Sequence, residues 1–458
     1  MTTEHVDYVV IGGGRAANLA IAFAKKGFKT VLIERDLLGG TCPNRGCVPS
    51  KLLIGFAEAS RRVHEADRHF VEATHHGQDR EQVFAEVNAY VGQVDGGYEK
   101  RVVAAGVDLI RGEARFVGPK TVAAGNRVVS ADHVILATGS RPTPPPFADL
   151  PVWTSDALFP LKEGPPESLM VIGGGFIGTE MASFFSGVGS KVDLFVRRDG
   201  LLNREDEDIE QVFREEFSKA VSVHFRSSLK ALTYDGKLFT ATFEGEGGEH
   251  VQQAERVLFA IGRIPNSDML ALEKTGLKAN ARGFVPVNEF LETEVPGIYA
   301  IGDINGRFML QHAASFEAHY LRQRLLKGHD EPIDERLVAH AVFAHPEVAS
   351  IGLSEQQLKE SGTPYVSVFQ GWLASARAMS TRLDYPRIKL LVSSEDYSIL
   401  GCHLVGPESS TLLHQVMAVM RLRNDVRELA NMIYIHPALN ECILAAAVKA
   451  ASLVRKAR

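Results

Sequence analysis

Residues 8–17 read Tyr-Val-Val-Ile-Gly-Gly-Gly-Arg-Ala-Ala, and residues 169–178 read Leu-Met-Val-Ile-Gly-Gly-Gly-Phe-Ile-Gly. Each stretch is a short apolar run, typical of a buried parallel strand, followed by a glycine turn and an apolar helical segment. A second apolar run closes each unit, at residues 30–33 and 192–196. This order predicts two βαβ units, in which glycines let the backbone approach a pyrophosphate at a helix N-terminus. Two nucleotide-binding cores in one chain decide the fold.

The residues at the end of the second strand differ between the two units. Glu34 ends the first, about twenty residues after the glycine turn, where a carboxylate accepts hydrogen bonds from a ribose 2′-hydroxyl. The first unit is therefore expected to bind FAD. Arg197 and Arg198 end the second strand of the other unit, and guanidinium groups pair with a 2′-phosphate that a carboxylate would repel. The second unit is predicted to bind NADP(H) rather than NAD(H), the alternative being two solvated surface arginines.

The length of the chain and the positions of its turn and linker residues predict several domains. A chain of 458 residues is too long to fold around a single hydrophobic core. The predicted fold is α/β, with two Rossmann-like dinucleotide-binding domains followed by a C-terminal α+β domain of alternating strands and two helices. The predicted boundaries are 1–148 for the FAD-binding domain, 149–265 for the NAD(P)-binding domain, 266–336 for a central segment that returns to the FAD domain, and 337–458 for the C-terminal domain.

Composition and charge exclude several classes of protein. Apolar residues make up 45%, charged residues 23%, and the formal net charge is −6, so neither nucleic acid nor an anionic membrane is expected as a partner. No apolar run is long enough for a membrane span. The N-terminus lacks the basic and apolar regions of a secretory signal, so the expected location is the cytoplasm.

Residues 39–51 read Gly-Gly-Thr-Cys-Pro-Asn-Arg-Gly-Cys-Val-Pro-Ser-Lys and contain Cys42 and Cys47. In a reducing compartment such a pair is redox-active or metal-binding rather than a structural staple. Cys47 begins an apolar-periodic helix, whose positive dipole end favours a thiolate. Zinc would lack a second ligand pair at finger spacing, so no metal site is predicted. Cys402 and Cys442 lie in apolar surroundings and are expected to be buried.

A helical stretch is expected after the cysteine loop, from about residue 51 to residue 105. The histidine-rich part, residues 64–76, has no regular ligand spacing. It is expected to be a solvated helix and turn without a metal.

These motifs resemble the flavoprotein pyridine nucleotide–disulfide oxidoreductases, which include glutathione, trypanothione, mycothione and mercuric reductases and dihydrolipoamide dehydrogenase. The family's Gly-Gly-Thr-Cys-x-Asn-x-Gly-Cys-x-Pro-x-Lys signature is matched at residues 39–51. Its Gly-Asp motif for FAD is matched at residues 302–303, and its C-terminal His-Pro-x-x-x-Glu motif at residues 436–441. The similarity spans essentially the whole chain. It implies a homodimer in which the C-terminal domain is the dimerisation domain.

The resemblance also implies a set of site residues. The catalytic set is Cys42, Cys47, His436, Glu441, Lys51 and Glu180. The FAD set is Gly12, Gly14, Ala17, Glu34, Gly40, Thr41, Lys51, Ala114, Gly139, Gly302, Asp303 and Gln311. The NADPH set is Gly173, Gly175, Phe176, Ile177, Gly178, Arg197, Arg198 and Gly262, with Phe176 at the place of an aromatic gate over the flavin.

The family mechanism, carried to these positions, implies NADPH reduction of the flavin and opening of a Cys42–Cys47 disulfide. Cys47 is the sulfur beside the isoalloxazine, and Cys42 attacks the substrate. His436 of the partner subunit moves the proton, and Glu441 orients it. Thiolate attack on a disulfide indeed needs a base near neutral pH and a protonated leaving thiol.

The predicted function is reduction of a low-molecular-weight disulfide by NADPH, as in glutathione or mycothione reductase. Dihydrolipoamide oxidation with NAD is the first alternative, against which Arg197 and Arg198 argue. A mercuric-reductase-like metal reductase is another alternative, although no metal-binding domain and no terminal cysteine pair are present. A redox sensor that only retains the scaffold is a fourth. Pro43 and Arg45 depart from the common family pattern and are expected to alter the substrate mouth.

Overall fold

The computed structural model describes residues 3–160 and 164–457. Its first unit is a seven-stranded sheet in the order β3-β2-β1-β6-β5-β4, with β17 also paired to β6. The strands are β1 (Thr3–Ile11), β2 (Thr30–Glu34), β3 (Asp108–Arg111), β4 (Ala114–Gly118), β5 (Thr121–Ala124), β6 (Arg127–Leu136) and β17 (Ile298–Ala300). Neighbours from β3 to β6, and β17, run parallel. Val9 and Val10 are completely buried, as expected for a strand covered on both faces.

Helices α1 (Ala17–Lys25) and α7 (Gln311–Lys327) pack together over one face of this sheet. Because β17 and α7 come late in the chain, the segment after residue 266 does return to the first sheet. A two-stranded ribbon, β7 (Ser140–Pro142) with β16 (Arg263–Pro265), ties the two ends of the second unit together.

The second unit is a parallel five-stranded sheet in the order β11-β10-β9-β15-β8. The strands are β8 (Trp153–Thr154), β9 (Ser168–Ile172), β10 (Lys191–Phe195), β11 (Ser222–His224) and β15 (Arg256–Phe259), and the helices are α5 (Phe176–Gly187) and α6 (Glu207–Phe217). An antiparallel meander of β12 (Ser228–Tyr234), β13 (Phe239–Gly245) and β14 (Gly248–Ala254) is inserted before β15. The predicted pair of Rossmann-like units is confirmed.

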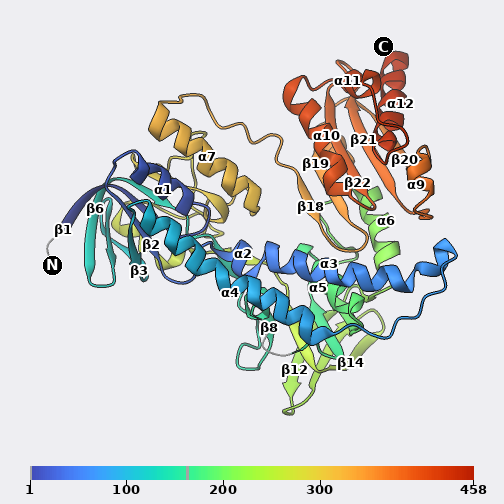
Figure 1. Ribbon diagram of the computed structural model, residues 1–458, viewed down its shortest axis with the longest axis horizontal. Helices are drawn as coiled ribbons and strands as arrows, with labels where there is room; N and C mark the ends of the chain where they lie inside the picture. Colours follow the sequence, from blue (N-terminus) through green and yellow to red (C-terminus); the bar gives the residue numbers. More distant parts are fainter. Residues whose placement is uncertain (1–2, 161–163, 458) are drawn as a thin grey trace.

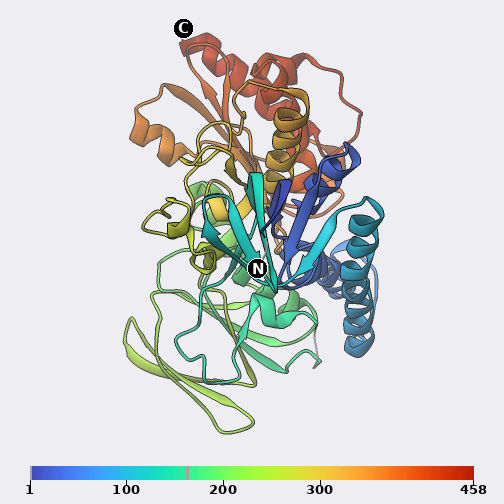
Figure 2. The same cartoon turned by 90° about the vertical axis from the view of Figure 1, so that its left-hand side faces the viewer.

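The C-terminal domain is an antiparallel sheet in the order β18-β19-β22-β21-β20. Its strands are β18 (His340–Val342), β19 (Val348–Gly352), β20 (Tyr365–Gly371), β21 (Arg387–Ser393) and β22 (Ile399–Val405). Its helices are α8 (Glu355–Ser361), α9 (Ala376–Met379), α10 (Ser409–Leu422), α11 (Val426–Asn431) and α12 (Glu441–Ala457). Cys402 and Cys442 are buried in its core, as predicted. Figure 2, which looks at the molecule from the side of the first sheet, shows this domain at the top and the second unit at the bottom.

The helical stretch expected from about residue 51 to residue 105 is interrupted after His64, in the part (residues 64–76) that was expected to form a helix and a turn. Helix α3 (Cys47–His64) ends before a short 3-10 turn, η1 (Ala66–His69), and α4 (Arg80–Ala104) begins anew. Phe70 has a left-handed backbone with φ of 61°, which ends the turn, and Asp79 caps α4 by accepting from the Gln82 N–H. No group of three or more metal-ligating side chains occurs in the described ranges, this segment included.

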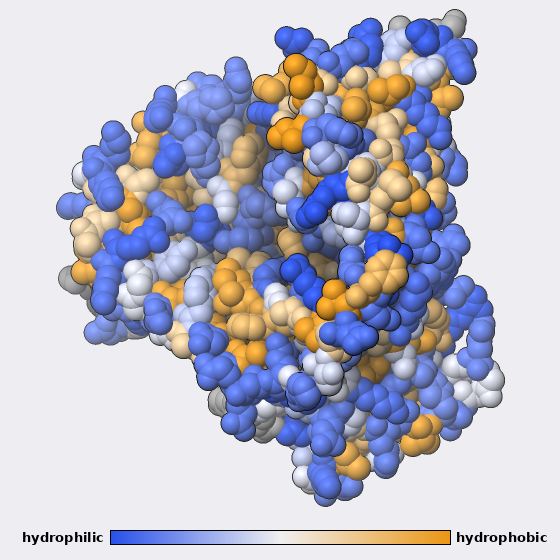
Figure 3. Space-filling model, turned by 45° about the vertical axis from the view of Figure 1, so that its right-hand side comes forward, coloured by the Kyte–Doolittle hydropathy of each residue, from blue (hydrophilic) through white to orange (hydrophobic). Residues whose placement is uncertain are grey.

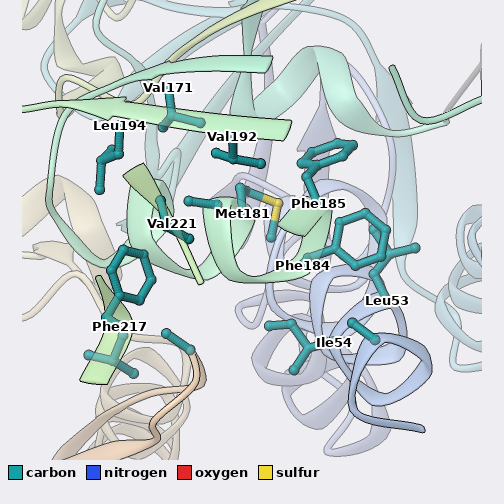
Figure 4. Packing of buried hydrophobic residues seen from close by; sticks show 14 of the residues in the cluster. Leu53, Ile54, Val171, Met181, Phe184, Phe185, Val192, Leu194, Phe217 and Val221 are labelled. Atoms are coloured by element: carbon teal, nitrogen blue, oxygen red, sulfur yellow. The ribbon is translucent and has the colours of Figure 1, made fainter. Parts of the chain in front are cut away.

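Helix α3 joins the two nucleotide-binding units. Figure 1 shows α3 crossing the middle of the molecule next to α5. Leu53 and Ile54 of α3 pack against Met181 and Phe184 of α5 in the largest apolar cluster (Figure 4). Burial of such side chains contributes about 2 kcal/mol each. The helix that begins at Cys47 is therefore held against the helix that begins at Phe176.

A buried lysine joins the second unit to the C-terminal domain. Lys389 of β21 is 1% exposed, and its Nζ lies 2.8 Å from Asp206 Oδ1, 2.5 Å from Asp208 Oδ2 and 2.6 Å from Glu355 Oε2. Burial alone would lower the pKa of Lys389, but its three carboxylate partners raise it instead. The ammonium is therefore charged within the interface.

The helices of residues 3–160 and 164–457 include none with the length and apolar composition needed to cross a membrane.

Candidate active site

A cavity lies at the carboxyl ends of the strands in the first sheet, where open parallel sheets bind ligands. All members of the predicted FAD set except Ala17 and Lys51 line it. Ala17 is buried at the start of α1, and Lys51 lies on α3 beside Glu180. The lining residues come from sequence positions 11 to 314, so folding gathers distant motifs along one cavity.

The glycine turn after β1 leaves no space for a side chain at its first position, Gly12. Gly12 has φ of 109°, and a Cβ there would lie 2.2 Å from the carbonyl oxygen of Ala137. Glu34 Oε2 accepts a hydrogen bond of 2.6 Å from the Gly13 N–H. Oε1 accepts one of 2.7 Å from the Asp36 N–H. Glu34 therefore fixes the shape of the turn in addition to the ribose-binding role expected from the sequence.

The opposite wall of the cavity is built around Asp303. Ser140 Oγ donates to Asp303 Oδ2 over 2.5 Å, which orients the carboxylate. Below it, the Gly302 N–H donates to Glu317 Oε2 over 2.5 Å, and Glu317 is completely buried. Burial raises the pKa of Glu317 to about 8. Nothing in the local sequence pattern distinguishes Glu317 from a surface glutamate on an α-helix, so its role could not be predicted from the sequence.

Several polar atoms in this cavity have no protein partner. Arg15 Nε, Asn44 Oδ1 and Thr138 Oγ1 are buried without a hydrogen bond in the described part of the chain, and all three residues line the cavity. Buried polar atoms are usually satisfied, so these three fit a polar ligand. A guanidinium beside the N-terminus of α1 suits an anionic diphosphate. The donor and acceptor set thus fits FAD. Arg15, which directly follows the glycine turn, is an additional candidate that the sequence did not predict.

The two cysteines face each other across a helix junction. Cys42 lies in α2 (Thr41–Arg45), and Cys47 is the first residue of α3. The Asn44 side chain donates to the carbonyl oxygens of Leu38 and Gly40, at 2.9 and 2.8 Å, and so holds the loop. Both sulfurs are free thiols, and Cys47 is exposed.

The thiols share one hydrogen bond that separates their acidities. Donation from the Cys42 thiol to the Cys47 sulfur lowers the pKa of Cys47 to about 7, and the Lys51 ammonium acts in the same direction. The same hydrogen bond, together with burial, raises the pKa of Cys42. Cys47 is therefore the thiolate of the reduced pair, while Cys42 needs a base before it can act as a nucleophile.

The alkylation rate of Cys47 in the reduced protein is expected to rise with a midpoint near pH 7, because its thiolate forms above that pH. An unperturbed thiol would show about 8.5. The measurement is iodoacetamide labelling of Cys47 across pH, followed by mass spectrometry. In the variant Lys51→Met the midpoint should rise by about one unit, since a neighbouring positive charge is removed. A midpoint at the ordinary value in both proteins would contradict this assignment.

Lys51 and Glu180 form an ion pair next to this junction. Lys51 Nζ lies 2.6 Å from Glu180 Oε2, and the Glu180 side chain is only 10% exposed. The N–H of Phe343 donates to Glu180 Oε1 over 3.0 Å, and the Phe343 ring lies 4.9 Å from Lys51 Nζ. The C-terminal domain therefore completes the environment of a pair formed by α3 and α5.

The second glycine turn repeats the geometry of the first. Gly173 has φ of 116°, and a Cβ there would lie 2.4 Å from the carbonyl oxygen of Ala260. Gly178 is equally constrained, since a Cβ would lie 1.9 Å from the Gly173 oxygen. The remaining predicted NADPH residues are placed around this turn: Gly175, Phe176 and Ile177 at the start of α5, and Gly262 after β15, with φ of 117°.

Arg197 and Arg198 follow β10 at the edge of this second site. Both are exposed. Within residues 3–160 and 164–457, neither guanidinium forms a hydrogen bond or an ion pair. The neighbouring carboxylate of Asp199 instead pairs with Arg226. Both arginines therefore lie exposed after β10, where the sequence predicts contact with a 2′-phosphate.

His436 lies far along the chain from the cysteines and is not among the residues that line the cavity beside Cys42. Its side chain is 75% exposed, and Nδ1 lies 2.7 Å from Glu441 Oε1. Glu441 Oε2 also accepts from the Ala438 N–H over 3.0 Å. These contacts, first that with His436, lower the pKa of Glu441. With Nδ1 held in this way, Nε2 is the nitrogen left for proton transfer.

Comparison with known proteins agrees with this geometry. The sequence family of the pyridine nucleotide-disulphide oxidoreductases matches residues 6–318. The family of their dimerisation domain matches residues 338–447. The dihydrolipoyl dehydrogenase of Vibrio cholerae is 32% identical over 456 residues, covering 97% of this chain and 95% of that protein. The same enzyme of Haloferax volcanii is 33% identical over 460 residues, with 97% and 96% covered.

Among solved structures, the chain is similar to the HOCl-induced flavoprotein disulfide reductase RclA from Escherichia coli. In its Cu(II) complex the TM-score is 0.87 at 25% identity, covering 98% of this chain and 100% of that chain. A second structure of RclA gives a TM-score of 0.86 at 26% identity, covering 96% of this chain and 99% of that chain.

Proposed function

Since this chain belongs to the pyridine nucleotide-disulphide oxidoreductase family, an enzyme family that binds FAD and a pyridine nucleotide, we propose that it is an NADPH-dependent reductase of a low-molecular-weight disulfide. The observation that carries the proposal is the combination of the polarised Cys42 and Cys47 pair with two unpaired arginines after β10. Bound FAD would supply the two-electron link between the nicotinamide and the cysteines.

The chain's own residues account for the disulfide chemistry. Cys42, once deprotonated, attacks one sulfur of the substrate, and the first product thiol leaves with a proton from His436. The Cys47 thiolate then attacks the Cys42 sulfur, which releases the second product thiol and closes the Cys42–Cys47 disulfide. Two electrons from NADPH reopen that disulfide, so one NADPH and one proton yield two thiols.

We propose a homodimer in which His436 serves the cysteine pair of the other copy. None of the described residues that line the cavity beside Cys42 is a histidine, although Cys42 needs a base. His436 is exposed, and Ile433 and Ile435 next to it are 97% and 80% exposed. Figure 3 shows apolar side chains on the lobe that the C-terminal domain forms. Apolar side chains exposed to this extent suit a covered interface.

Arg197 and Arg198 are proposed to select NADPH over NADH. The double variant Arg197→Glu/Arg198→Ala is expected to shift the ratio of kcat/KM for NADPH over that for NADH by about a hundredfold toward NADH. Each charge-assisted hydrogen bond to the 2′-phosphate contributes about 1.5–3 kcal/mol, and a carboxylate repels it. The measurement is the steady-state rate at which the FAD-containing enzyme oxidises NADPH and, separately, NADH.

The control is Lys237→Ala, which removes an exposed cation from the turn between β12 and β13 of the same unit. It should leave the ratio unchanged. An unaltered NADPH to NADH ratio in the double variant would argue against a phosphate-binding role for the arginines.

A second candidate function is NAD-dependent oxidation of dihydrolipoamide, which the names of the dihydrolipoyl dehydrogenases favour. One experiment separates the two. Oxidised glutathione, mycothiol disulfide and lipoamide are assayed for NADPH and NADH consumption, and dihydrolipoamide is assayed for NAD⁺ reduction. Turnover of a disulfide with NADPH supports the first function, whereas efficient reduction of NAD⁺ by dihydrolipoamide alone supports the second.

A further inference from the structure

The ring of Phe176 rests on a side chain from the C-terminal domain. Phe176 is the first residue of α5, and its ring centroid lies 5.5 Å from that of the His340 imidazole, with 22° between the planes. This is a stacked contact of the kind that contributes free energy beyond simple burial. His340 is the first residue of β18, so the orientation of Phe176 depends on a strand of another domain.

The imidazole of His340 pairs with a buried carboxylate, that of Glu205. Its Nε2 lies 2.6 Å from Glu205 Oε1, and Ser350 Oγ donates to Glu205 Oε2 over 2.6 Å. The Glu205 side chain is 0% exposed. Burial would raise the pKa of Glu205, but the contacts with His340 and Ser350 outweigh burial and lower it. A buried carboxylate that loses its donor is costly, so the imidazole has little freedom to leave.

The same short segment also contacts the ion pair near the cysteines. Phe343, three residues after His340, donates its N–H to Glu180 and covers Lys51 with its ring. The position of β18 relative to α5 is therefore fixed at two points, at Phe176 and at Glu180. The stack between Phe176 and His340 is thus a defined contact on a rigid support.

The geometry points to His340 as a positioning residue that holds Phe176 in its resting orientation, so that an entering nicotinamide ring has to break the stack. This inference rests on the proposed function and on the expectation, implied by the family resemblance, that Phe176 lies where the nicotinamide enters. The adenosine half of the nucleotide would bind at the glycine turn and the arginines without moving Phe176. The stack therefore weakens binding of the whole dinucleotide but not of its adenosine half.

Two matched variants of the holoprotein test the inference. Glu205→Gln is combined with His340→Ala in one and with His340→Phe in the other, so that no buried charge is stranded and the two proteins differ only in the ring. Dissociation constants for NADP⁺ and for 2′,5′-ADP are measured by calorimetric titration. A stacked pair stabilises its contact by about 0.5–1.5 kcal/mol, so the Ala variant should bind NADP⁺ roughly two- to tenfold more tightly than the Phe variant. Both should bind 2′,5′-ADP equally well.

Equal NADP⁺ affinities in the two variants, or weaker binding by the Ala variant, would overturn the positioning role. A general loss of structure would weaken both ligands together, and melting curves of the two proteins would reveal it. The single variant Glu205→Gln keeps His340 and should match the Phe variant. If the unaltered holoprotein binds NAD⁺ and ADP instead of NADP⁺ and 2′,5′-ADP, the affinities of the Ala and Phe variants are compared with NAD⁺ and ADP. Binding of no nucleotide by the unaltered protein would instead refute the proposed function.

Discussion

Replacing Cys42 by serine is expected to reduce turnover of every disulfide substrate by at least about a thousandfold, because the hydroxyl cannot form the mixed disulfide. Electron transfer from NADPH to the bound flavin should continue, since Cys42 is not among the residues proposed to bind NADPH. The measurement pairs steady-state disulfide reduction with stopped-flow bleaching of the flavin. The two readouts are expected to separate.

The matched control is Cys402→Ala, which removes a thiol buried in the C-terminal sheet. It should retain turnover within a few-fold, apart from a stability cost of about 1 kcal/mol. Disulfide reduction that persists in Cys42→Ser would show that the exchange does not pass through this sulfur.

Replacing His436 by alanine is expected to lower kcat by about a thousandfold, within the range for loss of a general acid–base group. Cys42 has a raised pKa and therefore depends on an external base. The loss should be larger for the half-reaction with the disulfide than for flavin reduction. Replacing Glu441 by glutamine should cost less, because Nδ1 would keep a hydrogen-bond acceptor.

Mixed dimers test whether the histidine acts across the subunit interface. In a hybrid of a Cys42→Ser subunit with a His436→Ala subunit, one site keeps both groups if they come from different chains. Random reassembly of equal amounts should then restore about a quarter of the wild-type activity, because half of the dimers are hybrids and each has one intact site. If both groups acted within one chain, mixing would restore none.

The two nucleotide-binding units could be predicted because their determinants are local. An apolar strand, a glycine turn and a helix follow one another directly, and Gly12 and Gly173 both have the positive φ that the turn requires. The helix start at the end of the cysteine loop could also be predicted, because α3 begins at Cys47 as expected. The domain boundaries at residues 148, 265 and 336 stay predictions.

Other parts of the site depend on contacts between distant segments and left no local signal. Nothing around Glu205 or His340 indicates that the two meet, since the contact forms only when the C-terminal domain docks on the second unit. The interruption after His64 was expected only as a turn within residues 64–76, because the first glycine or proline after His64, the usual signal of a helix end, is Gly77. The Lys51–Glu180 pair was anticipated only through the family resemblance, because its members lie on different helices.

The ammonium of Lys389 has a consequence for protein engineering. Asp206 is fully enclosed, and its cationic neighbour is supplied by β21, almost two hundred positions downstream. In the intact chain, loss of the Lys389 ammonium alone would leave this anion enclosed without a counter-charge, at a cost of several kcal/mol. Chimeras with related enzymes should therefore exchange Asp206 and Lys389 together.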